Sequence, residues 1–407
     1  MPRATISIII ALLCNVIQHC EYALFGLSSA IIVKVFFPQG EILDRLIWFY
    51  TLLLVSVFFK PLGSYIFGRI GDIYGRSKTF KIGMFISGFS TLSIGLIPSF
   101  EQIGYLSLFM LIFCRISLIM TGNIDNVTIY ITESISKNHK NFASGLIGLS
   151  VQTGILLASI AFYISDYYKT EYLWRMNFII SGLLGLLMLL LRKFIIESSE
   201  FEIYKNNNQI LKQPLESIFT LIKKQRIVFS KAMIMHGSIG GIYNFYILFF
   251  TNYVFHIIKI DNNHQSDMAI NIGIACCAIL APVAGLLADK FNSKKQILYF
   301  LVINLLIIII NIILINYNYY SFVLHIILLS IYPFFVIPII IEIKEMFDVK
   351  VRMRLYGLSH TIGSTILSSS TPLICTILFK VTSIYFAPLL YLLFLNILLI
   401  IFTPKNV

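Results

Sequence analysis

Long apolar runs, separated by short polar segments, follow one another along almost the whole chain. Each run holds about 20 residues, the length of an α-helix that crosses the hydrocarbon core of a bilayer. Twelve such runs lie near residues 6–33, 46–67, 80–98, 103–131, 142–165, 175–195, 229–256, 268–288, 296–315, 320–341, 355–379 and 383–402. Backbone groups in hydrocarbon must be paired within the segment, and runs this long are unlike barrel strands. The pattern therefore predicts an all-α polytopic membrane protein with twelve transmembrane helices.

Composition agrees with this prediction, because the 407 residues are 58% hydrophobic and only 12% charged, too apolar for one soluble core. The first run is too long for a cleaved signal peptide and contains His19 and Glu21, so we expect a retained span. All six cysteines fall inside runs without a C-x-x-C pair, which indicates buried thiols. We expect no disulfide framework, no metal and no cofactor.

The net charge of +12 would suggest nucleic-acid binding in a soluble protein, but the positions of the bases explain it here. With the N-terminus placed inside, 23 of the 31 Lys and Arg residues lie in cytoplasmic segments. The positive-inside rule therefore predicts that both termini are cytoplasmic. Nucleic-acid binding is not expected.

The longest polar stretch divides the runs six and six. We expect an N-terminal six-helix bundle at 1–195, a cytoplasmic linker at 196–228 and a C-terminal six-helix bundle at 229–407. The loop "GRIGDIYGRSK" (68–78) in the first half returns as "GLLADKFNSKK" (285–295) in the second. The offset between Asp72 and Asp289 is 217 residues (289 − 72), as it is between Gly68 and Gly285. Parallel six-helix repeats are typical of transporters, with the substrate site at the repeat interface.

The repeated loop predicts a cytoplasmic latch, in which glycines allow close approach and an aspartate accepts from arginines or a helix N-terminus. The alternative is a positive-inside turn with no role beyond topology. A phosphate-binding loop is excluded, because neither G-x-G-x-x-G nor G-x-x-x-x-G-K is present. The gate residues that we predict are Gly68, Arg69, Gly71, Asp72, Gly75, Arg76, Lys78, Asp125, Glu133, Gly285, Asp289, Lys294 and Glu342.

Four stretches carry a resemblance to a known family: "CNVIQHCEYALFG" (14–26), "FFKPLGSYIFGRIGDIYGRSKT" (58–79), "WRMNF" (174–178) and "ESSEF" (197–201). The chain resembles the major facilitator superfamily and, within it, the metabolite:proton symporters that include proline/betaine, dicarboxylate and citrate carriers. The resemblance implies proton-coupled uptake of a small polar or zwitterionic metabolite. We also expect the protein to be a monomer. An Ile- and Asn-rich, Trp-poor composition is typical of AT-rich bacterial genomes, so we expect the inner cell membrane.

The chain also departs from that family. Where the family shows E-W-Y-D in the first span, this chain has "QHCE" (18–21), and "RISLIMTGNID" (115–125) keeps Arg115 but loses the fourth-span glycines. The resemblance therefore does not fix the substrate. Proline or betaine, a dicarboxylate or other organic acid, and a decayed paralogue without transport all stay open. A membrane-embedded protease is excluded, because H-E-x-x-H is missing and Arg69 interrupts G-x-G-D.

Charges inside spans are costly and are functional candidates by default. Glu21 and Arg115 each lie twelve residues, about 18 Å, from the outer end of their spans, so they are level with each other. This depth predicts either a buried structural pair or a substrate and proton site. Under the second reading, a substrate carboxylate competes for Arg115 and favours protonation of Glu21, so that both bind together.

Other residues in or near spans complete the predicted site. Asn15 and His19 accompany Glu21, and Tyr243, Asn244 and Tyr246 form an aromatic and amide stripe suited to a zwitterion. The alternatives are helix packing for a lone histidine and interface packing for the stripe. By depth, Asp125 belongs near the cytoplasmic gate or is a solvated helix-end acid.

Overall fold

The computed structural model describes residues 3–37, 56–121, 128, 130–132, 135, 137–168, 172–191, 217–250, 253, 258, 263–317, 319 and 321–403. These residues are almost entirely helical and contain no strand. Eight helices are long and apolar enough to span a membrane, and two shorter apolar helices accompany them. Described helices cover part or all of each of the twelve predicted spans, which confirms the predicted fold class.

The chain forms two compact units. The first unit holds residues 1–134, 150–213 and 349–357, and the second holds 135–149, 214–348 and 358–407. Two short segments therefore belong to the unit that is formed mainly by the other half of the sequence: residues 135–149 to the second unit and residues 349–357 to the first. One is the start of helix α9, and the other includes the start of helix α18.

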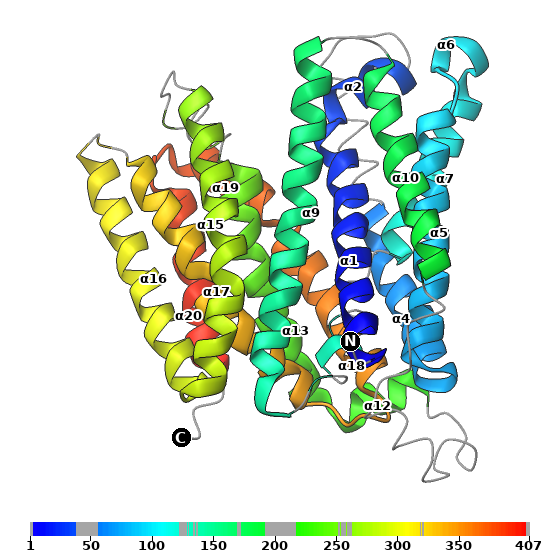
Figure 1. The fold of residues 1–407 in the computed structure, drawn as a ribbon. Helices are drawn as coiled ribbons and strands as arrows, with labels where there is room; N and C mark the ends of the chain where they lie inside the picture. Colours follow the sequence, from blue (N-terminus) through cyan, green and yellow to red (C-terminus); the bar gives the residue numbers. More distant parts are fainter. Residues whose placement is uncertain are drawn as a thin grey trace. The chain divides into compact units, whose positions relative to one another are not determined.

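The first unit is a helical bundle, drawn in blue to green in Figure 1. Its helices are α1 (Arg3–Leu27), α2 (Ser29–Phe36), α4 (Lys60–Tyr74), α5 (Arg76–Leu96), α6 (Phe100–Ile103), α7 (Tyr105–Thr121), most of α9 (Lys140–Tyr168) and α10 (Leu173–Leu191).

Small residues let the helices of this unit approach closely. A methyl group on Gly182 of α10 would lie 2.4 Å from the backbone nitrogen of Leu92 on α5, and one on Gly154 of α9 would lie 2.3 Å from the carbonyl of Val16 on α1. Such small-residue contacts are the usual way in which membrane helices associate. At one end, Trp174 and Phe178 pack edge to face within an aromatic core.

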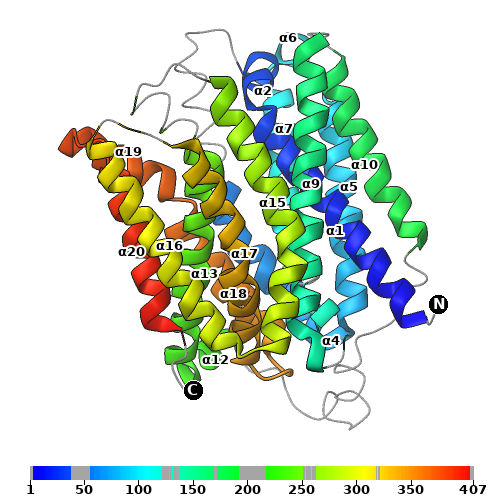
Figure 2. The ribbon, with the colours of Figure 1, turned by 60° about the vertical axis from the view of Figure 1, so that its left-hand side comes forward.

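The second unit contains η1 (Lys137–His139) and the start of α9, followed by α12 (Ile218–Lys224), α13 (Arg226–Asn244), η3 (Phe245–Phe249), α15 (Asn263–Lys290), α16 (Ser293–Asn316), α17 (Phe322–Glu345), the end of α18 (Arg352–Gly363), η5 (Ser364–Ser368), α19 (Thr371–Thr382) and α20 (Ala387–Phe402). Figure 2 shows α16 alongside α17 and α20. The elements η3 and η5 are π-helical turns that continue α13 and α18. Such turns are frequent at functional sites.

The repeated motif lies on helices rather than in a loop. In the first copy α4 continues to Tyr74 and α5 begins at Arg76, so the turn is reduced to Gly75, whose φ of 105° favours glycine. In the second copy Asn292 occupies the equivalent position. Its side chain caps α16 by accepting from the backbone N–H groups of Lys294 and Lys295. The two copies thus reach the same sharp bend by different local chemistry.

Candidate functional site

Glu21 lies at a junction of three helices inside the first unit. Its carboxylate is fully buried, and Oε2 accepts a hydrogen bond of 2.8 Å from the hydroxyl of Ser87 on α5. Oε1 lies against α10, where a methyl group on Gly185 would be only 2.3 Å away. The absence of a side chain at Gly185 therefore makes room for the carboxylate.

Arg115 on α7 meets the same helix α1 through aromatic rings. Its guanidinium carbon lies 4.2 Å from the ring centroid of Phe25 and 5.1 Å from that of Tyr22, which is cation–π geometry. The side chain is 4% exposed, and among the described residues Nε and Nη1 have no hydrogen-bond partner. A buried cation with two open donors is expensive in a membrane-spanning helix, which marks a functional position.

The expected direct pairing of Glu21 with Arg115 is not what the structure shows. Both side chains are buried on or against α1, as the depth argument predicted, but they contact different partners. Successive residues on a helix point about 100° apart, so Glu21 is directed to α5 and α10 while its neighbour Tyr22 is directed to α7. Equal depth in two helices does not establish a shared face.

Asn15 and His19 lie on the side of α1 that faces α9. The Asn15 amide donates to the hydroxyl of Ser150 at 2.7 Å, and Nδ1 of His19 donates to the Asn15 carbonyl at 2.9 Å. Gln18, one position before His19, donates to the carbonyl of Thr121 on α7 at 3.0 Å. Helix α1 therefore makes buried polar contacts on three sides: toward α5 and α10, toward α7, and toward α9.

The predicted stripe of the second unit is divided by the start of η3. Asn244 donates to both the carbonyl and the hydroxyl of Ser368, at 2.9 Å each, and so joins the end of α13 to η5. Tyr246 is fully buried and donates to Asn304 on α16 at 3.0 Å. Tyr243 is only half-buried, and its ring lies 5.6 Å from that of Tyr332. The three residues thus contact different partners.

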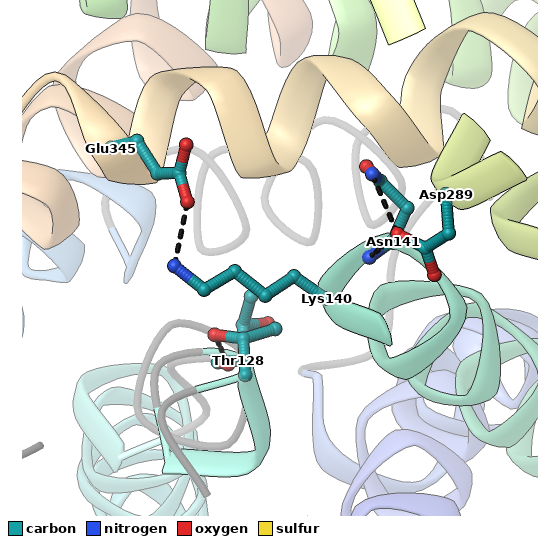
Figure 3. A network of polar contacts seen from close by, with 6 residues as sticks. Thr128, Lys140, Asn141, Asp289 and Glu345 are labelled. Atoms are coloured by element: carbon teal, nitrogen blue, oxygen red, sulfur yellow. Dashed lines mark hydrogen bonds and ion pairs between the residues drawn. The ribbon is translucent and has the colours of Figure 1, made fainter. Parts of the chain in front are cut away.

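The second motif copy caps the start of α9 (Figure 3). Oδ1 of Asp289 accepts from the backbone N–H of Asn141 at 3.0 Å and from its side-chain amide at 2.9 Å, while Oδ2 accepts from the N–H of Phe142 at 2.8 Å. Gly285 makes the approach possible, because a methyl group there would lie 2.3 Å from the Asn141 carbonyl. A carboxylate at a helix N-terminus satisfies otherwise unpaired donors and complements the helix dipole.

An ion pair that the sequence did not predict also holds the start of α9. Nζ of Lys140 lies 2.7 Å from Oε1 of Glu345 at the end of α17 (Figure 3). The lysine side chain is 14% exposed and the glutamate 47%, so solvent screens the pair only in part. Glu342, one of the predicted gate residues, accepts a hydrogen bond of 3.2 Å from the hydroxyl of Ser293.

The first motif copy lies against the corresponding helix start. A methyl group on Gly68 would be 3.1 Å from Cα of Arg354, and one on Gly71 would be 2.4 Å from Sδ of Met353, in the first turn of α18. Arg69 is exposed, and the Lys78 ammonium lies 4.6 Å from the ring centroid of Tyr74. Each motif copy therefore meets the start of a helix from the other half of the sequence.

Some predicted residues fall outside the description. Asp125 and Glu133 lie outside the described residues, as do the side chains of Asp72 and Arg76 and most of the predicted linker. The backbone N–H of Lys294, a predicted gate residue inside the described part, donates to the side chain of Asn292 at 3.0 Å.

The two helical bundles, with helices long and apolar enough to span a membrane, define a class, the polytopic helical membrane proteins. The sequence profile of the Major Facilitator Superfamily matches residues 22–372. The chain belongs to the Major Facilitator Superfamily.

Relatives and solved structures agree with this family. A putative proline/betaine transporter of Staphylococcus aureus (strain COL) is 28% identical over 397 residues, covering 93% of this chain and 83% of that protein. The proline/betaine transporter of Salmonella typhimurium is 25% identical over 306 residues, covering 72% and 61%. The structure of the proton:xylose symporter XylE bound to 6-bromo-6-deoxy-D-glucose superposes with a TM-score of 0.75 at 14% identity, covering 98% and 96%, which establishes the fold.

Proposed function

We propose that this transporter imports a small zwitterion with a carboxylate group, such as proline or glycine betaine, together with protons by alternating access. Relatives named as proline/betaine transporters support the substrate class. The open donors of Arg115 carry the proposal. A guanidinium binds a carboxylate through charge-assisted N–H···O bonds, and this one is buried with Nε and Nη1 unpartnered among the described residues.

Burial decides what Arg115 can select. Removing a cation from water costs several kcal/mol, and a matching anion with good geometry recovers much of that cost. The rings of Phe25 and Tyr22 hold the guanidinium without neutralising it. A substrate carboxylate would supply the missing charge and the missing acceptors.

Glu21 is the proposed proton carrier, and its link to Arg115 runs through α1. Protonation would remove a negative charge from the junction with α5 and α10, and would change the hydrogen bond from Ser87. Since Tyr22 and Phe25 lie on the same helix, any shift of α1 would also move the rings that hold Arg115. Proton binding and substrate binding would then depend on each other without a direct ion pair.

The motif copies are the proposed cytoplasmic gate. Asp289 caps α9 across a glycine contact, and Gly68 with Gly71 brings the first copy onto α18 in a similar way. We propose that Asp72 belongs to this gate as the repeat of Asp289, since both aspartates follow their glycine by four residues. Breaking such charge-assisted bonds would shift the balance between conformations.

We further propose that the protein acts as a monomer in a bacterial inner membrane, with both termini and the linker in the cytoplasm. The support is the excess of Lys and Arg in the segments that the twelve-span topology places inside.

Substrate exchange in proteoliposomes tests the proposed site. Labelled glycine betaine, L-proline, succinate and citrate are each exchanged against the same unlabelled compound, without an imposed proton gradient. We expect exchange of a zwitterion by the wild type and its loss in Arg115→Gln, while Lys34→Gln, which removes an exposed base, exchanges normally. Exchange of succinate or citrate alone, without exchange of a zwitterion, would favour an organic-acid carrier. No exchange of any compound by a folded wild type would favour a decayed paralogue.

A further inference from the structure

The short helix α12, just before the seventh predicted span, exposes a large apolar side chain. Gln225 separates the end of α12 from the start of α13, and its φ of −113° and ψ of 28° interrupt the α-helical course. The chain therefore bends where it enters the span. Phe219 of α12 is 80% exposed, and Ile227 in the first turn of α13 is 74% exposed. Each side of the bend thus presents one large apolar side chain.

Basic side chains share this exposed surface. Lys223 follows Phe219 by four residues, so the two lie on one face of α12, and both are exposed. Arg226 is exposed beside Ile227 in the first turn of α13. We call these four residues, Phe219, Lys223, Arg226 and Ile227, the bend face.

Buried residues on the opposite side fix the direction of the bend face. Leu221, two positions after Phe219, is 5% exposed, and Phe229, two positions after Ile227, is 7% exposed. Residues two positions apart lie about 200° apart around a helix. Both helices are therefore packed against the second unit on one side, and the bend face points away from it.

The charge of this segment has one sign. Residues 217–231 contain four bases and neither Asp nor Glu, and Glu216, the nearest acid in the sequence, lies outside the described residues. Water suits the bases of such a surface but not its large apolar side chains. The surface of a membrane with anionic lipids suits both, because acyl chains lie directly beneath negatively charged phosphates.

We propose that the bend face binds an anionic phospholipid at the membrane surface where α13 enters the bilayer. Phe219 and Ile227 contact the acyl chains near the headgroup, and Lys223 and Arg226 donate to the phosphate oxygens. A lipid with a net negative charge, such as phosphatidylglycerol, is preferred to phosphatidylcholine, whose choline offsets the phosphate. The proposal needs the membrane location of the chain but neither the proposed substrate nor proton coupling.

Tryptophan fluorescence tests the bend face directly. Phe219→Trp is reconstituted into vesicles of phosphatidylglycerol and phosphatidylcholine in which one lipid or the other carries brominated acyl chains, which quench a tryptophan that they touch. The signal of Trp48 and Trp174 is measured in the wild type and subtracted. We expect quenching at position 219, with a preference for phosphatidylglycerol on the order of fivefold or more.

Charge variants in the same background identify the groups that select the lipid. Replacing both bases, Lys223→Gln with Arg226→Gln, should bring the preference close to one. The control Lys295→Gln removes an exposed base at the start of α16 and should leave the preference unchanged. Raising the salt from about 0.05 to about 0.5 M should lower the preference of Phe219→Trp itself, which checks the charge contribution without a second variant.

Three results would overturn the proposal. Absence of quenching by either brominated lipid would mean that the bend face lies in water or under another part of the protein. Equal quenching by both lipids would remove the selection for negative charge. A preference that persists in the double variant and at high salt would show that Lys223 and Arg226 do not bind the headgroup.

Discussion

Loss of the Asp289 charge should loosen the start of α9. Asp289→Asn keeps the shape of the side chain, but an amide offers one acceptor oxygen where the carboxylate offers two. The two backbone donors, Asn141 and Phe142, now bond to separate oxygens at 3.0 and 2.8 Å. At least one of these bonds is lost and the other becomes neutral.

The size of the effect follows from those two bonds. A hydrogen bond to a charged group contributes roughly 1.5–3 kcal/mol and a neutral one about 1 kcal/mol, and the charge at the helix N-terminus contributes about 0.3–1 kcal/mol more. Asp289 is half-buried, so solvent screening reduces the sum, and we expect a net loss of about 1.5 kcal/mol. That is about a tenfold change in the equilibrium between the bonded and open helix start.

Amide hydrogen exchange of the segment 137–150 measures this change. Asp289→Asn should exchange the Asn141 and Phe142 amides about tenfold faster than wild type, and the exposed control Asp348→Asn should leave them unchanged. The same variant should also slow transport if the contact belongs to the gate. Protection within twofold of wild type in Asp289→Asn would refute the argument that this carboxylate holds α9.

Three further results are expected. Glu21→Gln should exchange substrate but fail to accumulate it under a proton gradient, measured as labelled uptake; normal accumulation would make Glu21 structural. Gly185→Ala places a methyl group 2.3 Å from Oε1 of Glu21, so the flexible carboxylate must move and substrate accumulation should fall severalfold. The control Gly26→Ala, whose methyl group would have no atom within 4 Å, should accumulate substrate as the wild type does in the same assay. Single cysteines at residues 208 and 318 should react with impermeant reagent only from the inside and only from the outside respectively, and external labelling at 208 would overturn the topology.

Much of the fold could be predicted from the sequence, because hydrocarbon allows few backbone solutions. Apolar runs of about 20 residues must become helices, and the structure confirms that class. The equal offset of Asp72 and Asp289 indicated two equivalent places in the fold, and each motif copy meets a helix start from the other half of the sequence. The helical course of the motif was not foreseen, because glycines usually indicate a loop.

The partners of the candidate site could not be read from the sequence. Depth along a helix follows from counting residues, but the direction of a side chain depends on helix rotation and on which helices are neighbours. Glu21 therefore meets Ser87 and Gly185, and Arg115 meets Phe25, although depth suggested that the two charges meet each other. The ring contact between His236 and His360 could not be predicted either, because it joins helices more than 100 residues apart in the chain.

Accumulation of labelled glycine betaine by wild-type proteoliposomes tests the central claim most directly. A proton-motive force on the order of 100 mV provides about 2.3 kcal/mol per proton, so coupling to one proton should sustain an inside-to-outside ratio approaching fiftyfold. An ionophore that collapses the gradient should return the ratio to one, and substrate addition alone should carry protons inward. Exchange that equilibrates at a ratio of one, with or without the gradient and without proton movement, would contradict proton-coupled import.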